Sequence, residues 1–457
     1  MQRTLLILLI AASYGLVAGA RPWALAALLA IAVLAVAVAP RRTLKFSSPA
    51  IDRALIAVAA AMALQIVPLP AAIVGALSPH RARVVEALGY APLTAATSGW
   101  QTLSIDPALT AWALGTFVLG VLAFWVTRAL CGAGGHTRAI CRTLAIVGPT
   151  AAVLALLQKA VTPRLLMFAV SPDARSGNPF GAFVNRNHMA AWLLLAMMPL
   201  AGYLIARLRI HSDSRLPFWS AFKQFLVSGA ALTAMAVIVM LGVLLLTLSR
   251  SGLIGLAVAA IVAWLTGRTR IQLERTSVPG LIGGAGVLLL VAVLFVDVDG
   301  WASRFQQSVD FGPAEFSRTQ IWKESAPLAA DFWLPGTGAG TYSEAMTQYQ
   351  QTRLWVNSMR RWAHFNNAHS HYVQAAVEGG VLLALPLLWA LVAFTTLAMK
   401  IVPADKGEMF WVRTGAAAAL AGVAVQSIFE TSLIMPANAV MAGVAAGLAL
   451  YRRNATH

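Results

Sequence analysis

The amino-acid sequence predicts an all-α polytopic membrane protein, and two features of its composition support this fold class. Hydrophobic residues make up 59% of the 457-residue chain and charged residues only 11%, with a mean hydropathy of +0.73. Soluble globular proteins carry about 25% charged residues. Because so few charges cannot cover a water-exposed surface, we expect lipid to surround most of the chain.

Apolar runs long enough to cross a bilayer recur along the sequence. A helix needs about 20 apolar residues to span roughly 30 Å of hydrocarbon. Twelve runs near this length are separated by proline, glycine or charge clusters, at 4–20, 23–39, 51–68, 108–126, 143–160, 189–206, 225–247, 251–267, 279–296, 374–398, 411–429 and 434–451. We therefore predict about 12 transmembrane helices in four parts: N-terminal helices (1–160), central helices (161–296), one large loop (297–373) and C-terminal helices (374–457).

The basic residues divide unequally between the two sides of the predicted membrane. The chain has 34 Lys and Arg against 17 Asp and Glu, a formal net charge of +17. With the N-terminus in the cytoplasm, the cytoplasmic segments hold 20 basic and 5 acidic residues, and the external segments hold 14 and 12. Cytoplasmic loops are enriched in Lys and Arg. The surplus therefore indicates topology, with both termini cytoplasmic, and it does not indicate nucleic-acid binding.

The first apolar run is either a cleaved signal peptide or a retained transmembrane helix. Arg3 before the run and Ala18-Gly19-Ala20 after it fit a cleaved signal peptide. Short loops of polytopic proteins have the same composition, so we favour a retained helix.

Cys131 and Cys141 fall in one short polar segment and are expected to be unpaired thiols.

The 77-residue loop at 297–373 holds five of the fourteen tryptophans. Loops of this length in compact domains are usually functional. Its Ser317-Arg318-Thr319-Gln320 segment is a capping box, which predicts a helix that begins at Arg318. The helix should end before the glycine-rich segment 335–340, which we interpret as a turn because no strand precedes it and its spacing is not that of a phosphate loop.

A polar segment precedes the sixth run directly. It contains Asn185, Arg186, Asn187 and His188 where a helix should begin. Free N–H groups and the positive end of the helix dipole favour an anion at such a position. Arg186 would complete an anion site there; the alternative is an interfacial anchor in which Arg186 contacts lipid headgroups.

Arg250 lies in the segment Ser249-Arg250-Ser251-Gly252, between two apolar runs with no room for a loop. An arginine at this depth is costly unless it has a partner or extends to the interface. Both interpretations, a functional charge and a snorkelling side chain, stay open at this point.

Three histidines gather before the tenth run, at His364, His369 and His371. A His-x-His pair can bind zinc, but its side chains converge on one metal mainly in a strand, and here a helix begins. No further pattern of zinc ligands accompanies it. We therefore predict no metal and no cofactor.

These segments resemble a known family. His369-Ser370 followed after nine residues by Gly380, with Tyr372, Gln374 and Glu378 between them, resembles the signature of the O-antigen ligase and polysaccharide polymerase superfamily of bacterial inner membranes. The segments 180–188 and 248–252, and Arg318 followed by Trp322 and Pro335-Gly336, are similar to other blocks of the family. The resemblance covers roughly residues 170–400. It departs at Leu383, where the family has a second glycine.

The resemblance implies a fold, a location and partners. The fold would be similar to that of GT-C glycosyltransferases, in the inner membrane, with the large loop and the active site on the periplasmic side. The donor would be a glycan on undecaprenyl diphosphate, and the acceptor a glycan or the lipid A core. Membrane lipids surround the protein in this interpretation, and flippase or chain-length-control proteins are implied as partners.

The resemblance also implies roles for individual residues. Guanidinium groups bind phosphate oxygens bidentately, which suits Arg250 and Arg318 to the diphosphate, and His369 would act as general base or donate a hydrogen bond to the diphosphate as imidazolium. With no obvious nucleophile, transfer should invert the anomeric configuration. The expected catalytic residues are His369, Arg250 and Arg318; the expected substrate-binding residues are Arg186, Asn185, Asn187, His188, His371, Tyr372 and Trp322.

Alternatives remain within and outside this enzyme class. The segment Phe-x-Asn-Arg-Asn-His at 183–188 looks more like exopolysaccharide polymerase members of the family, which favours a polymerase over an O-antigen ligase. The different class is a transporter of lipid-linked glycans. Transporters often show related halves and polar groups at the midplane, whereas the polar residues of this chain cluster on one side.

Overall fold

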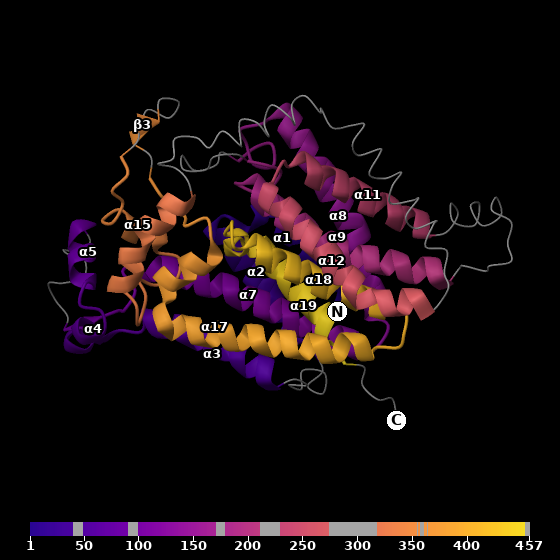
Figure 1. Cartoon of the computed structure of the whole chain (residues 1–457), viewed down its shortest axis with the longest axis horizontal. Coiled ribbons are helices and arrows are strands. Elements are labelled where there is room, and N and C mark those ends of the chain that lie inside the picture. Colours follow the sequence, from indigo (N-terminus) through magenta and orange to yellow (C-terminus); the bar gives the residue numbers. More distant parts are fainter. Residues whose placement is uncertain are drawn as a thin grey trace.

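The computed structural model describes residues 1–39, 49–89, 99–170, 179–210, 229–273, 318–353, 355–356, 361–362 and 364–452. Helices account for most of them (Figure 1). The predicted ninth run at 279–296 and the first part of the large loop, including Trp301 and Ser317, lie outside the described residues, so the number of spans stays a prediction.

Each predicted run within the described residues contains a helix. Seven of these helices (α3, α7, α8, α9, α11, α12 and α17) are long and apolar enough to cross a membrane, in agreement with the predicted all-α membrane class. The helices are α1 (Gln2–Gly15), α2 (Pro22–Ala37), α3 (Pro49–Ile66), α7 (Pro107–Gly132), α8 (His136–Val161), α9 (Arg186–Ile210), α11 (Gly229–Leu246), α12 (Arg250–Leu273), α17 (His371–Ala404), α18 (Phe410–Gln426) and α19 (Pro436–Leu450).

Helix α9 lies at the centre of the bundle. Its side chains from His188 to Met198 are buried, and it packs against α8, α11, α12, α18 and α19. Glycines allow the backbones of α9 and α18 to approach closely: a Cβ on Gly202 would lie 2.0 Å from the carbonyl oxygen of Trp411, and one on Gly415 would lie 2.1 Å from that of Met198. Small residues serve the same purpose in other packed membrane helices.

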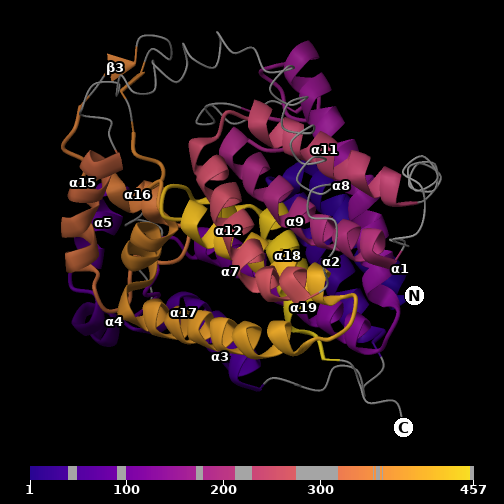
Figure 2. The same ribbon diagram turned by 45° about the vertical axis from the view of Figure 1, so that its right-hand side comes forward.

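A second layer of short helices covers one end of the bundle (Figure 2). It combines α15 (Arg318–Asp331) and α16 (Tyr342–Met346) from the large loop with α4 (Ala71–Leu77) and α5 (Arg81–Ala87) from the connection between α3 and α7. Two short antiparallel ribbons accompany them, β1 (Leu69–Pro70) with β2 (Trp100–Gln101), and β3 (Trp355–Val356) with β4 (Arg361–Trp362).

The second layer has a hydrophobic core of its own. Val84 and Val85 of α5 pack with Ile321 and Leu328 of α15 and with Tyr342 of α16. The predicted helix at Arg318 is confirmed and ends at Asp331, before the glycine-rich segment. The sequence did not predict that residues 69–89 and 99–107 join this layer, because they carry no helical run long enough to recognise.

Helix α17 is broken at Gly380, which has φ +52° and ψ −155°. The segment 333–338 takes up the backbone groups that the break leaves without helical partners. The amides of Thr337 and Gly338 donate to the carbonyls of Val377 and Glu378 at 3.0 Å, and the amide of Val381 donates to the carbonyl of Trp333 at 2.8 Å. The glycine-rich segment is thus a turn, as predicted, and it anchors the first part of α17.

The side chain of Gln65, near the end of α3, also contacts both the glycine-rich segment and the first part of α17. Its amide donates to the carbonyls of Pro335 and Glu378 at 2.8 Å each, and its oxygen accepts from the amide of Ala339 at 3.0 Å. Helices α3 and α17 run side by side (Figures 1 and 2). The segment 335–339 is therefore tied to α3 beside the break in α17.

Candidate active site

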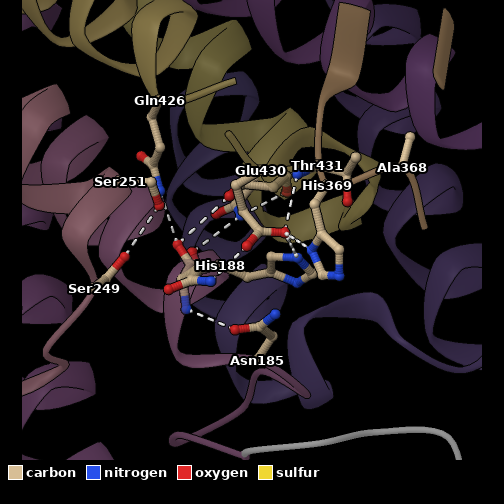
Figure 3. A network of polar contacts seen from close by, with 12 residues as sticks. Asn185, His188, Ser249, Ser251, Ala368, His369, Gln426, Glu430 and Thr431 are labelled. Carbon is tan, nitrogen blue, oxygen red and sulfur yellow. Dashed lines mark hydrogen bonds and ion pairs between the residues drawn. The ribbon is translucent and has the colours of Figure 1, made fainter. Parts of the chain in front are cut away.

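Side chains from two distant segments, 187–188 and 369, meet at the carboxylate of Glu430, which follows α18 and is only 1% exposed. His188 Nε2 and His369 Nδ1 each lie 3.7 Å from Oε1 of this carboxylate, and the side-chain amide of Asn187 donates to Oε2. Figure 3 shows both imidazole rings directed at Glu430.

The start of α9 is fixed by its own side chains and by a tight turn before it. The side-chain oxygen of Asn185 accepts a hydrogen bond from the amide of Asn187 at 2.9 Å, which caps the helix. In the turn, Gly181 has φ +62°, and its amide donates to the side chain of Gln158 at 2.7 Å. Arg186, the first residue of α9, is half-buried.

Backbone contacts from two helices hold His369 in place. His369 has φ +48°, a left-handed conformation that is uncommon for a residue with a Cβ. The indole N–H of Trp322, on α15, donates to the carbonyl of Ala368 at 2.8 Å, and the amide of His371 donates to the carbonyl of Ser427 at 2.8 Å. Ser370 caps α17 through the amide of Val373. The conformation of His369 is thus set from both sides.

Arg250 and Arg318, like Arg186, are the first residues of helices. Ser249 is fully buried and accepts a hydrogen bond from the amide of Gly252 at 3.1 Å, so α12 begins at Arg250. Arg318 begins α15 and interacts electrostatically with both Glu430 and Arg250. Burial, with a further contribution from Arg250, lowers the pKa of Arg318, while the attraction of Glu430 raises it. The guanidinium stays charged at neutral pH.

The carboxyl group of Glu430 is ionised at neutral pH. Burial raises its pKa, but the attraction of His188 and His369, whose ring nitrogens lie 3.7 Å away, outweighs burial and holds the pKa well below its usual value. His371 also interacts electrostatically with His188 and with Glu430. The site therefore sets one buried negative charge among imidazole and guanidinium groups.

The structure brings five of the predicted site residues together around this carboxylate: His188, Asn187, His369, His371 and Arg318. Arg250 interacts electrostatically with Arg318. Asn185 and Arg186 lie at the adjoining start of α9. Tyr372 is half-exposed, and its hydroxyl donates to the carbonyl of Ala424 on α18 at 2.9 Å. Trp322 acts on the backbone next to His369.

Sequence reasoning missed Glu430. It directly follows the predicted run 411–429 and sits beside Thr431 and Ser432. An acidic residue at the end of an apolar span is a functional candidate by default, so this signal was available. No local motif accompanies Glu430, however, and its histidine partners are more than 60 residues away along the chain.

The comparisons with known proteins bear on this part of the chain. Residues 235–388 match the family model described as Wzy_C, O-antigen ligase. The matched segment contains Arg250, Arg318 and His369 and extends past the break in α17. The match confirms the resemblance to the O-antigen ligase superfamily, and no curated protein matches the chain.

Proposed function

We propose that the protein, through its O-antigen ligase domain, is a metal-independent, inverting glycosyltransferase. It transfers a glycan from undecaprenyl diphosphate to a sugar hydroxyl at the periplasmic face of the inner membrane. The observation that carries this proposal is the convergence of His369 and His188 on the buried Glu430, with Arg318 attracted by the same carboxylate and Arg250 in electrostatic interaction with Arg318.

The chemistry needs a base for the acceptor and positive charge for the leaving group. The anomeric carbon of the donor already carries a good leaving group, so no covalent nucleophile is required. His369 accepts the proton of the attacking hydroxyl. Arg250 and Arg318 stabilise the charge that builds on the diphosphate, and Arg186 at the start of α9 adds a third guanidinium. Direct displacement inverts the anomeric centre.

The other residues expected to bind substrate lie next to His369 or at the start of α9. Asn185, Asn187 and His188 lie at the start of α9, where helix N–H groups favour an anion. His371, Tyr372 and Trp322 flank His369 on the side of α17 and α15. We assign these residues to binding of the glycan or the diphosphate.

Two products are compatible with this chemistry. A polymerase joins repeat units to each other, and we favour it because of the Phe-x-Asn-Arg-Asn-His segment at 183–188. A ligase hands the finished chain to the lipid A core, and the description of the matching family favours this second candidate. A deletion strain separates them on a gel. Loss of polymer with single units still attached to lipid A indicates a polymerase, and polymer left on its carrier indicates a ligase.

Reconstitution tests the enzyme class itself. Purified protein in proteoliposomes is supplied with undecaprenyl-diphosphate glycan and an acceptor glycan, and the product is analysed for a new glycosidic bond. We expect transfer in the presence of EDTA. Movement of the lipid-linked glycan across the bilayer without a new bond would instead identify a transporter.

A further inference from the structure

We infer that Glu430 is a positioning residue that fixes the tautomer and orientation of His369, so that Nε2 of His369 faces the acceptor hydroxyl as the base. This inference rests on the proposed function and assigns a role to a residue outside the family match at 235–388.

The position of the carboxylate favours one of the two ring nitrogens of His369 as the one that carries the proton. An ionised carboxylate has only acceptor oxygens, and it lies 3.7 Å from Nδ1 of His369. At this distance the negative charge attracts an N–H at Nδ1. The neutral ring is therefore expected to keep its proton on Nδ1, which leaves the lone pair on Nε2. The partner of one ring nitrogen sets the state of the other in this way.

The carboxylate itself cannot rotate freely. Its Oε1 accepts from the amide of Thr431 at 3.1 Å, and its Oε2 accepts from the side chain of Asn187. The peptide carbonyl of Asn187 in turn accepts from Gln426 Nε2 at 3.0 Å. With both oxygens held and the side chain 1% exposed, Glu430 presents a fixed direction to the imidazole ring.

The charges around Glu430 give it a second effect on His369. The groups that face it are His188 from α9, His369 and His371 from the start of α17, and Arg318 from α15, to which Arg250 is coupled. All of these groups can carry positive charge. When His369 takes the proton of the hydroxyl it becomes a cation among cations, and the negative charge of Glu430 stabilises it.

Kinetics of Glu430→Gln test this role. We expect kcat to fall by about 10²–10⁴-fold, the range for general-base catalysis, with a smaller change in KM. The acidic limb of the pH profile of kcat/KM should move to lower pH, because the protonated imidazole loses its negative neighbour. Glu430→Asp should recover part of kcat. A wild-type kcat with an unmoved acidic limb in Glu430→Gln would overturn the inference.

Glu324→Gln is the matched control. Glu324 is also a buried carboxylate, and it accepts hydrogen bonds from Gln320 and from Gln351 and Thr352 in the second layer. The substitution removes a buried charge outside the site, so the acidic limb should stay where it is in the wild type. An equal shift of the acidic limb in both variants would show that the loss of any buried carboxylate moves it, which would contradict the positioning role of Glu430.

Nitrogen NMR of the protein with ¹⁵N-labelled histidine provides a readout that needs no substrate, with the signals of His369 identified by their loss in His369→Asn. We expect the Nδ1–H tautomer in the wild type and a weaker preference for it in Glu430→Gln. Identical tautomer populations in the two proteins would refute the positioning role. If Glu430→Gln changes the tautomer population but the wild-type protein transfers no glycan, the positioning role holds and only the proposed function is contradicted.

Discussion

At the scale of single residues, the site combines two unfavourable states. A non-glycine residue in the left-handed region costs on the order of 1–3 kcal/mol, and His369 occupies this region with φ +48°. An ionised carboxylate removed from water is also costly unless partners surround it, and Glu430 is 1% exposed. Because the two side chains are held against each other, their placement points to a function rather than to a need of the fold.

Substitution of His369 or of Arg250 by alanine should abolish transfer and leave folded protein in the membrane. His369 is only partly buried and Arg250 is exposed, so neither change removes a large part of the core. The measurement is product formation in proteoliposomes, with the elution profile of the purified variants as the check on folding. Full activity in both variants would remove the proposed mechanism.

Arg318→Lys tests whether geometry or charge alone matters at the diphosphate. Lysine keeps the positive charge but offers a point charge in place of the planar fork of arginine. We expect kcat to fall by at least 10-fold, the effect of losing about 1.4 kcal/mol of transition-state stabilisation. If kcat stays at the wild-type value, only a point-charge role remains for Arg318.

The sequence pointed to ten candidate site residues but not to Glu430, the carboxylate at which several of them meet. His369, Arg250 and Arg318 stand out because polar residues are rare in an apolar chain and because they fall in family motifs. The partners of Glu430 become evident only when α18 and α19 pack on α9. Contacts between distant segments depend on packing, which periodicity and motifs do not encode.

At the scale of elements, the break in α17 connects the second layer to the site. Gly380 lies in a region of φ and ψ that is nearly exclusive to glycine, and a Cβ there would lie 2.6 Å from the carbonyl oxygens of Trp333 and Leu334. The family spacing identified Gly380 as special. The physical reason for glycine at this position is the segment 333–338, which enters the break. That contact depends on the fold and was not predictable from the sequence.

Gly380→Ala should therefore disturb both stability and activity. We expect a loss of about 1–3 kcal/mol in the free energy of unfolding, together with a lower kcat, because the first part of α17 carries His371 and follows His369. Thermal unfolding in detergent and the transfer assay measure the two effects. Gly242→Ala, in α11, is the control: nothing lies within 4 Å of its Cβ position, so it should not lose stability.

At the scale of the whole molecule, the helices bring the candidate site residues together at one end of the bundle. A separate pair of buried charges lies elsewhere in the bundle. Arg128 of α7 and Asp52 of α3 form a buried ion pair at 2.8 Å, with side chains 7% and 2% exposed, and the indole of Trp125 donates to Asp52 at 2.8 Å. Asp52 lies in the first turn of α3, whereas Gln65, which contacts the second layer, lies in its last turn. This pair therefore holds the bundle together far from the chemistry.

Asp52→Asn should lower stability without a specific effect on catalysis. Removing one partner of a buried ion pair costs about 3–5 kcal/mol, because the other charge stays buried without compensation. The exposed pair of Arg138 and Glu408, with side chains 58% and 47% exposed, gives the control, since Glu408→Gln should change the free energy of unfolding by less than about 1 kcal/mol. Unfolding in detergent measures both variants. At a temperature where each stays folded, kcat and its pH profile should equal those of the wild type, and a selective loss of kcat in Asp52→Asn would show that this end of the bundle also controls the site.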